Sequence, residues 1–230
     1  MKLSNETVAI LKNFATINAS IWINQGNVLK TIATPTKNVF AIATVKDSFP
    51  VDFGIYDLNN FLGVLSLHKE SPELEFDTVQ VRIKGLAGRS QISYRFTDKD
   101  MITVPPDKKI VLRNIDASLD LEEDDYVWVT NAAKQLQSPN ISVRSDGKKI
   151  SLVTFDPKND AAHSEALEVG GVTGDGSVFD MVFATDNWNK IVPGSYKLEI
   201  CKDGVAHFTH QKDQLEYFIA LEKNPTKVEG

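Results

Sequence analysis

The apolar pattern of this 230-residue chain occurs twice, and this repetition constrains the fold more than any single motif does. Each half begins with apolar residues at helical spacing, continues with strand-like runs, and then has a shorter helical segment followed by further strands. The two longer helices begin near Ser4 and Asp124, and the two shorter ones near Asp57 and Asp186. The length suits two domains of ordinary size. We therefore predict an α+β protein of two similar domains, each with two helices and antiparallel sheets.

The predicted helices bury one face and leave a small, polar face opposite. In the first helix the apolar residues recur every three or four positions after Ser4, a favourable N-cap, and the opposite face carries Lys12. The second helix, capped by Asp57, has asparagine, glycine and serine opposite its leucines. The third helix carries Lys134, and a short fourth helix over residues 187–192 carries Lys190.

Strands are predicted wherever alternating apolar residues lie between turn signals. They cover residues 20–24, 28–34, 39–45, 51–56, 78–84, 90–96, 117–121, 141–144, 149–155, 165–169, 178–183, 196–201, 205–210 and 215–221. Two prolines beside three charged residues at 104–109 cannot form a central strand. We therefore place domain 1 at residues 1–104, an interdomain connector at 105–116 and domain 2 at 117–230.

Composition excludes several classes of protein. The chain has 31 acidic and 25 basic residues, a net charge of -6, so it is not coated with positive charge for nucleic acid, although basic groups can still gather on one face. No apolar run reaches the roughly 18–20 residues that cross a bilayer, and the polar N-terminus is no signal peptide. The single Cys201 excludes a disulfide framework and suits a reducing compartment. We expect an intracellular protein with no membrane partner.

Local catalytic and metal-binding motifs are poor. His207 and His210 lie three apart in a predicted strand and so point to opposite faces, and His68 has no cysteine or acidic residue at ligand spacing. The glycine-rich run at 170–176 lacks the Gly-Lys-Ser/Thr ending of a phosphate loop. The acidic run at 120–125 lacks calcium-loop spacing and suits a helix N-terminus instead. We expect a protein that is not an enzyme and has no catalytic residues, metal or cofactor.

Specific residues resemble one family, the sliding clamps of T-even-type bacteriophages. The resemblance is strongest in the first ~70 residues and extends in matching order to the end of the chain. It rests on residues 1–4, 11–18, 55–59, 61–63 and 65–67, and later on 136–137, 193–198 and 220–222. It implies a DNA-clamp fold, with the two helices of each domain inside a ring and the antiparallel β-sheets outside.

The resemblance also implies a function and a set of partners. Members of the family form homotrimeric rings that encircle duplex DNA without sequence preference and tether the replicative DNA polymerase for processive synthesis. A clamp-loader ATPase opens the ring, and the clamp also acts as a mobile activator of late viral transcription by the host RNA polymerase with viral factors. The family has no catalytic residue and no cofactor. The expected location is the cytoplasm of the infected bacterial host.

Simple geometry favours a trimer. If helices about 10 Å wide line the hole side by side, four from one chain enclose a bore of only ~13 Å. Eight helices from a dimer leave ~25 Å, and twelve from a trimer leave ~38 Å. A duplex is about 20 Å across, so only the trimer leaves comfortable room for water and sliding.

The resemblance suggests which residues face DNA and which bind partners. The DNA-facing candidates are Lys2, Lys12, Lys69, Lys134 and Lys190, although Thr130 and Asn131 lie where relatives are more basic. Each lysine can equally be an ordinary solvated surface residue. The candidates for a pocket that binds partner peptides are Ile110, Val111, Leu112, Ile219 and Leu221, and the alternative is that they belong to the domain core.

A second hypothesis is a phage structural or assembly protein built from two β-rich domains. It accounts for the acidity, the repeat and the missing catalytic motifs. It does not account for the N-terminal resemblance or for small polar helix faces that carry lysines. An enzyme with dispersed carboxylates has no support from the sequence.

Overall fold

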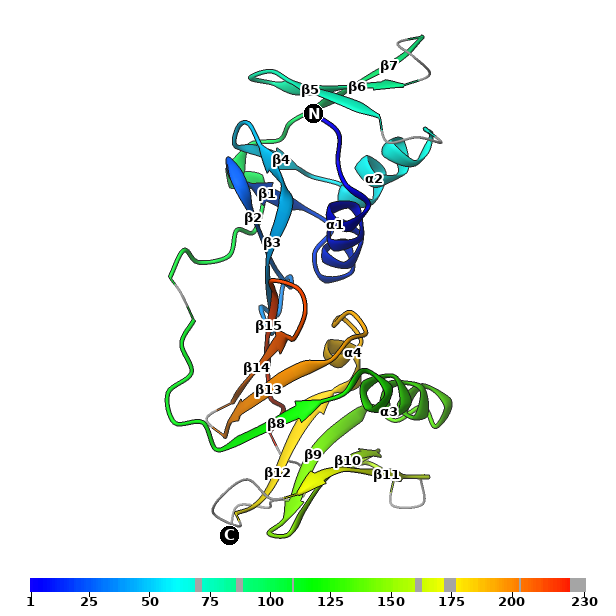
Figure 1. The fold of residues 1–230 in the computed structure, drawn as a ribbon, viewed down its shortest axis with the longest axis vertical. Helices are drawn as coiled ribbons and strands as arrows, with labels where there is room; N and C mark the ends of the chain where they lie inside the picture. The colour runs from blue at the N-terminus through cyan, green and yellow to red at the C-terminus, as the bar shows by residue number, and fades with distance from the viewer. Residues whose placement is uncertain are drawn as a thin grey trace. The chain divides into compact units, whose positions relative to one another are not determined.

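The computed structural model describes residues 1–68, 72–85, 89–108, 110–159, 163–171, 177–202 and 204–223 (Figure 1). The chain divides into two compact units, unit 1 at Met1–Lys108 and unit 2 at Lys109–Gly230. The division falls within the predicted connector, whose own limits stay a prediction. In the part of the chain that is described, no helix is long and apolar enough to cross a membrane.

The described part of unit 1 contains two helices, seven strands and a 3-10 turn at Lys99–Met101. The helices are α1 (Asn5–Ile17) and α2 (Leu58–Ser66), and they pack side by side (Figure 1). The strands are β1 (Ile21–Ile23), β2 (Gly26–Ile32), β3 (Val39–Phe49), β4 (Phe53–Ile55), β5 (Glu73–Phe76), β6 (Gln80–Gly85) and β7 (Ser90–Arg95). All pairings are antiparallel: β1 with β4, β2 with β3, and β6 between β5 and β7.

Capping and burial explain both helices of unit 1. The Ser4 hydroxyl oxygen accepts a hydrogen bond from the Thr7 N–H at 3.2 Å, and the Asp57 carboxylate accepts one from the Asn60 N–H at 2.9 Å. Leu11 and Phe14 of α1 are fully buried, as helical spacing predicts. Both predicted N-caps are confirmed.

Among its described residues, unit 2 has two helices and eight strands. Its helices are α3 (Glu123–Gln135) and α4 (Thr185–Trp188). Its strands are β8 (Ala117–Leu121), β9 (Asn140–Asp146), β10 (Lys149–Phe155), β11 (Glu165–Gly171), β12 (Val178–Ala184), β13 (Tyr196–Cys201), β14 (Val205–His210) and β15 (Leu215–Ala220). They form two antiparallel sheets, with strand orders β11-β10-β9-β12 and β15-β14-β13-β8.

The two units share one connectivity. In unit 2, β8 precedes α3 and pairs with β13, the first strand after α4. In unit 1, the Met1 amino group donates to the Leu74 carbonyl at 2.6 Å, and the Leu74 N–H donates to the Met1 carbonyl at 2.7 Å. The segment before α1 therefore joins β5, the first strand after α2, in the same way. This confirms the prediction of two similar α+β domains.

Two sequence predictions were wrong in detail. The strand β5 was not predicted, because its four residues are short and it is stabilised by pairing with β6 and with the chain terminus. The fourth helix spans Thr185–Trp188 and not residues 187–192. It follows β12 directly after Ala184, so Asp186 lies in its first turn and is not its N-cap.

Candidate functional site

The solvent face of α1 and α2 carries almost no charge apart from Lys12. Lys12 is exposed and makes no ion pair with another described residue. The other charged residue of α1, Glu6, lies 2.6 Å from the ammonium group of Lys46, and α2 contains no charged residue. Although the chain is acidic, this face is therefore locally positive.

The solvent face of α3 has its charges separated along the helix. Glu123, Asp124 and Asp125 lie in the first turn, and Lys134 is exposed in the last turn, so both ends complement the helix dipole. Burial and the neighbouring carboxylates of Glu122 and Asp124 raise the pKa of Asp125. The phosphate-attracting charge of α3 is thus confined to its C-terminal end.

Thr130 has a packing role in α3. Its hydroxyl accepts a hydrogen bond from the Trp188 indole N–H at 3.0 Å and donates to the Tyr126 carbonyl at 2.7 Å. A lysine could not replace this contact between α3 and α4. The packing of α3 on α4 therefore accounts for Thr130, whereas Asn131 is exposed and nothing in this contact explains it.

Two of the other candidate lysines, Lys2 and Lys190, lie near helices but not on them. Lys190 is half-buried and follows α4 by two residues, because α4 ends earlier than predicted. Lys2 is exposed and precedes the α1 N-cap. Lys69 lies outside the described residues.

The candidates for the partner pocket differ in burial. The side chain of Val111 is 67% exposed, those of Ile110, Leu112 and Leu221 are half-buried, and that of Ile219 is completely buried. Ile219 therefore belongs to the unit 2 core, on β15 opposite Ala206 of β14. The segment around Val111 stays largely in solvent.

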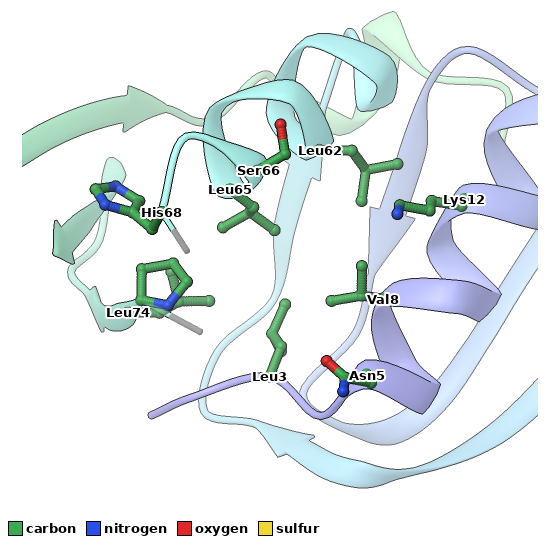
Figure 2. Close-up of a pocket in the computed structure, with 10 residues that line it drawn as sticks. Leu3, Asn5, Val8, Lys12, Leu62, Leu65, Ser66, His68 and Leu74 are labelled. Atoms are coloured by element: carbon green, nitrogen blue, oxygen red, sulfur yellow. The ribbon is translucent and has the colours of Figure 1, made fainter. Parts of the chain in front are cut away.

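A cleft lies between α1 and α2, and sequence reasoning did not predict it. It has a volume of about 170 Å³. Figure 2 shows Val8 and Lys12 of α1 facing Leu62 and Leu65 of α2, with Leu3 below them. The half-buried Val8, in the apolar stripe of α1, is the one local signal of an incompletely filled contact.

Two histidines of unit 2, His207 and His210, take part in packing, whereas His163 is exposed. The His207 ring stacks on Phe218 with centroids 4.1 Å apart, and its Nε2 lies 2.8 Å from Glu216. His210 contacts the Tyr196 ring, and its Nδ1 accepts the Asp213 N–H at 2.9 Å. In the portion of the chain that is described, no group of three or more His, Cys, Asp or Glu side chains could hold a metal ion.

Comparison with known proteins connects these features to one family. Residues 3–104 match the family described as DNA polymerase processivity factor. The sliding clamp of Vibrio phage KVP40 is 33% identical over 226 residues, which cover 96% of this chain and 99% of that protein. The sliding clamp of Enterobacteria phage T4 is 32% identical over 232 residues, which cover 98% and 99%.

Two solved structures share the fold at low sequence identity. The A. fulgidus PCNA bound to the C-terminal region of FEN-1 has a TM-score of 0.69 at 11% identity, covering 94% of this chain and 95% of that one. The Helicobacter pylori beta clamp bound to a DNA ligase peptide has a TM-score of 0.70 at 12% identity, covering 97% of this chain and 65% of that one. The likeness includes both units.

Proposed function

The chain belongs to the sliding-clamp family of DNA polymerase processivity factors, and we propose that it forms a closed homotrimeric ring that encircles duplex DNA and tethers the replicative polymerase. The observation that carries this proposal is the near full-length identity of 32–33% to two phage sliding clamps. The similar two-helix architecture of the two units supports it, because a closed ring is built from similar segments that repeat around its axis. We propose that the ring has no catalytic role.

The charge distribution supports encirclement without tight binding. Each phosphate that a protein neutralises adds salt-dependent affinity and hence friction against sliding. Lys12 on α1 and Lys134 on α3 provide isolated positive charges on otherwise polar faces. We propose that these two lysines, with Lys2, Lys69 and Lys190, face the DNA.

Exposed strand edges provide a means of closing the ring. Among the described strands, β7 lies at one edge of its sheet in unit 1, and β11 lies at one edge of its sheet in unit 2. β7 ends in the exposed Arg95, whereas β11 carries the exposed Glu165 and also Glu168, whose carboxylate pairs with Lys149 of β10 at 2.6 Å. We propose that β7 of one subunit pairs with β11 of the next, head to tail, with complementary charges along the seam.

Partner proteins are proposed to bind near the connector. The A. fulgidus and H. pylori clamps are described with bound peptides, which supports peptide binding as a shared use of this fold. Val111 offers an exposed apolar side chain, flanked by Ile110 and Leu112, and Leu221 is half-buried. We propose that these residues take the apolar anchors of the polymerase and the clamp-loader ATPase, with Ile219 supporting them from the core.

We extend the proposal to late viral transcription with the host RNA polymerase, on the strength of the family resemblance. No observation favours the alternative of a structural or assembly protein.

The homotrimeric ring is tested by light scattering coupled to size exclusion at micromolar concentration. The expected mass is about three times the chain mass of 25.5 kDa. A monomer or dimer that persists on concentration would contradict the homotrimer.

A further inference from the structure

Because the two units share one connectivity, their equivalent positions can be compared, and the comparison shows which side chains the cleft in unit 1 lacks. Val8 and Tyr126 are both the fourth residue of their helices, α1 and α3. Leu121 pairs with Tyr196 in unit 2, and the register set by Met1 and Leu74 brings Leu3 opposite Pro72 in unit 1. Unit 1 therefore has a valine and a proline where unit 2 has two tyrosines.

The tyrosines fill the gap between the helices of unit 2. The Tyr126 ring stacks on Trp188 with centroids 5.5 Å apart and planes 14° apart, and Tyr196 packs against it at 6.3 Å. All three side chains are buried. In unit 1 the corresponding space is the open cleft, with largely aliphatic walls formed by Leu3, Val8, Leu62, Leu65, Pro72 and Leu74. The fold thus has room for an aromatic ring at this place.

Polar groups surround the aliphatic walls. The Lys12 ammonium and the Asn5 amide have no hydrogen bond to any other described residue, and Figure 2 shows both at the α1 side of the cleft. Both ring nitrogens of His68 are buried without a hydrogen-bond partner. His68 packs on the backbone of β6, where a Cβ on Gly85 would lie 1.9 Å from Nδ1. The Lys12 ammonium and the Asn5 amide can therefore donate hydrogen bonds to a ligand that has acceptors and a negative charge, whereas the His68 ring nitrogens are buried against β6 and are closed to a ligand.

We propose that the α1–α2 cleft binds one unpaired nucleotide of single-stranded DNA. The base enters between Val8 and Leu65, the Asn5 amide contacts its polar edge, and the Lys12 ammonium pairs with its phosphate. This inference rests on the proposed function, which turns this helix face toward DNA. Paired bases would have to unpair and unstack before one could enter, so duplex DNA slides past while an unpaired nucleotide is held.

An octamer of thymidylate is the probe, titrated into the unloaded, full-length protein and followed by NMR chemical shifts and by fluorescence anisotropy. The variant Val8→Tyr introduces the side chain that fills this space in unit 2, and it should abolish the shifts in α1 and α2. Lys12→Gln should weaken binding at least fivefold. The matched control Lys158→Gln removes the same charge from an exposed position outside the proposed DNA-facing set and should change the affinity less than twofold.

Several outcomes would overturn the inference. One is an affinity that Val8→Tyr leaves unchanged. Another is an equal loss of affinity in Lys12→Gln and Lys158→Gln, which would mean diffuse electrostatic binding. Tighter binding of an Asp-Phe-Asp peptide than of the oligonucleotide in the same cleft would assign it to a protein partner instead. If Val8→Tyr does not fold, Ser66→Trp covers the cleft from an exposed position and replaces it. Because the titration uses unloaded protein, its failure leaves ring loading on duplex DNA untouched.

Discussion

The two units follow the same connectivity but fill the space between their helices differently. Unit 2 closes the gap between α3 and α4 with Tyr126, Trp188 and Tyr196, and Thr130 hydrogen-bonds to the tryptophan. Unit 1 leaves the gap between α1 and α2 open, with Lys12 beside it. One domain plan can therefore yield both a sealed helix pair and a cleft, depending on a few side chains.

The largest expected effect comes from removing the aromatic seal of unit 2. Trp188 is completely buried, so Trp188→Ala should lower the free energy of unfolding of unit 2 by about 3–5 kcal/mol. Leu65→Ala in unit 1 should cost only about 2 kcal/mol, because Leu65 already borders an open cleft. Chemical denaturation monitored by amide NMR signals of each unit measures both. Equal losses in the two units would contradict the comparison.

Alkaline pH should destabilise unit 2 before unit 1. Burial raises the pKa values of Tyr126, Tyr196 and Tyr217, so the folded unit keeps protons that the unfolded chain loses above its tyrosine pKa of about 10. This stability is fully present below pH 10 and is lost as the pH rises, by roughly 2–3 kcal/mol at pH 10.5.

Tryptophan fluorescence can follow this transition, because Trp128 and Trp188 lie in unit 2 whereas Trp22 lies in unit 1. A Trp22→Phe background leaves only the reporters of unit 2. Methyl NMR signals of unit 1 follow the transition of that unit separately. Loss of those signals before the fluorescence change, or no fluorescence change between pH 9 and pH 10.5, would refute the predicted order.

The smallest effect on stability is expected for the lysines. Lys134→Glu replaces the cation in the last turn of α3 and should lower the free energy of unfolding by about 0.3–1 kcal/mol through the helix dipole, whereas Lys12→Glu in mid-helix should lower it less.

The triple variant Lys12→Glu, Lys134→Glu, Lys190→Glu should nevertheless impair loading or processive synthesis, because it makes the proposed DNA channel repel phosphate. Unchanged processivity across a salt titration would remove these lysines from the DNA-facing surface.

The sequence predicted the helices and strands whose formation depends on residues close together in the chain. Ser4 and Asp57 identified two helix starts, and alternation identified all described strands except β5. The strand β5 could not be predicted, since its partners are β6 and the residues before α1. The α1–α2 cleft was also missed, because it depends on Val8 and Pro72 occupying places that only the register of the folded sheet relates to Tyr126 and Tyr196.

The sequence predicted the positions of some candidate site residues correctly and those of others wrongly. Helical spacing correctly placed Lys12 and Lys134 on solvent faces of α1 and α3. Lys190 was assigned to a helix because Asp186 resembles an N-cap, but the helix begins directly at the end of β12. Burial of Ile219 follows from the packing of β14 and β15 within the unit 2 core, which the sequence of β15 alone does not determine.

The central claim is encirclement, and retention on circular DNA tests it most directly. The labelled protein is loaded by its ATPase on a nicked circle, and its co-elution with DNA is measured before and after a single restriction cut. We predict stable retention on the circle, where escape requires opening a subunit interface, and rapid loss from the cut DNA, where the ring slides off an end. Equal retention on both forms would mean that the protein is held by contact, and it would contradict the sliding-clamp account.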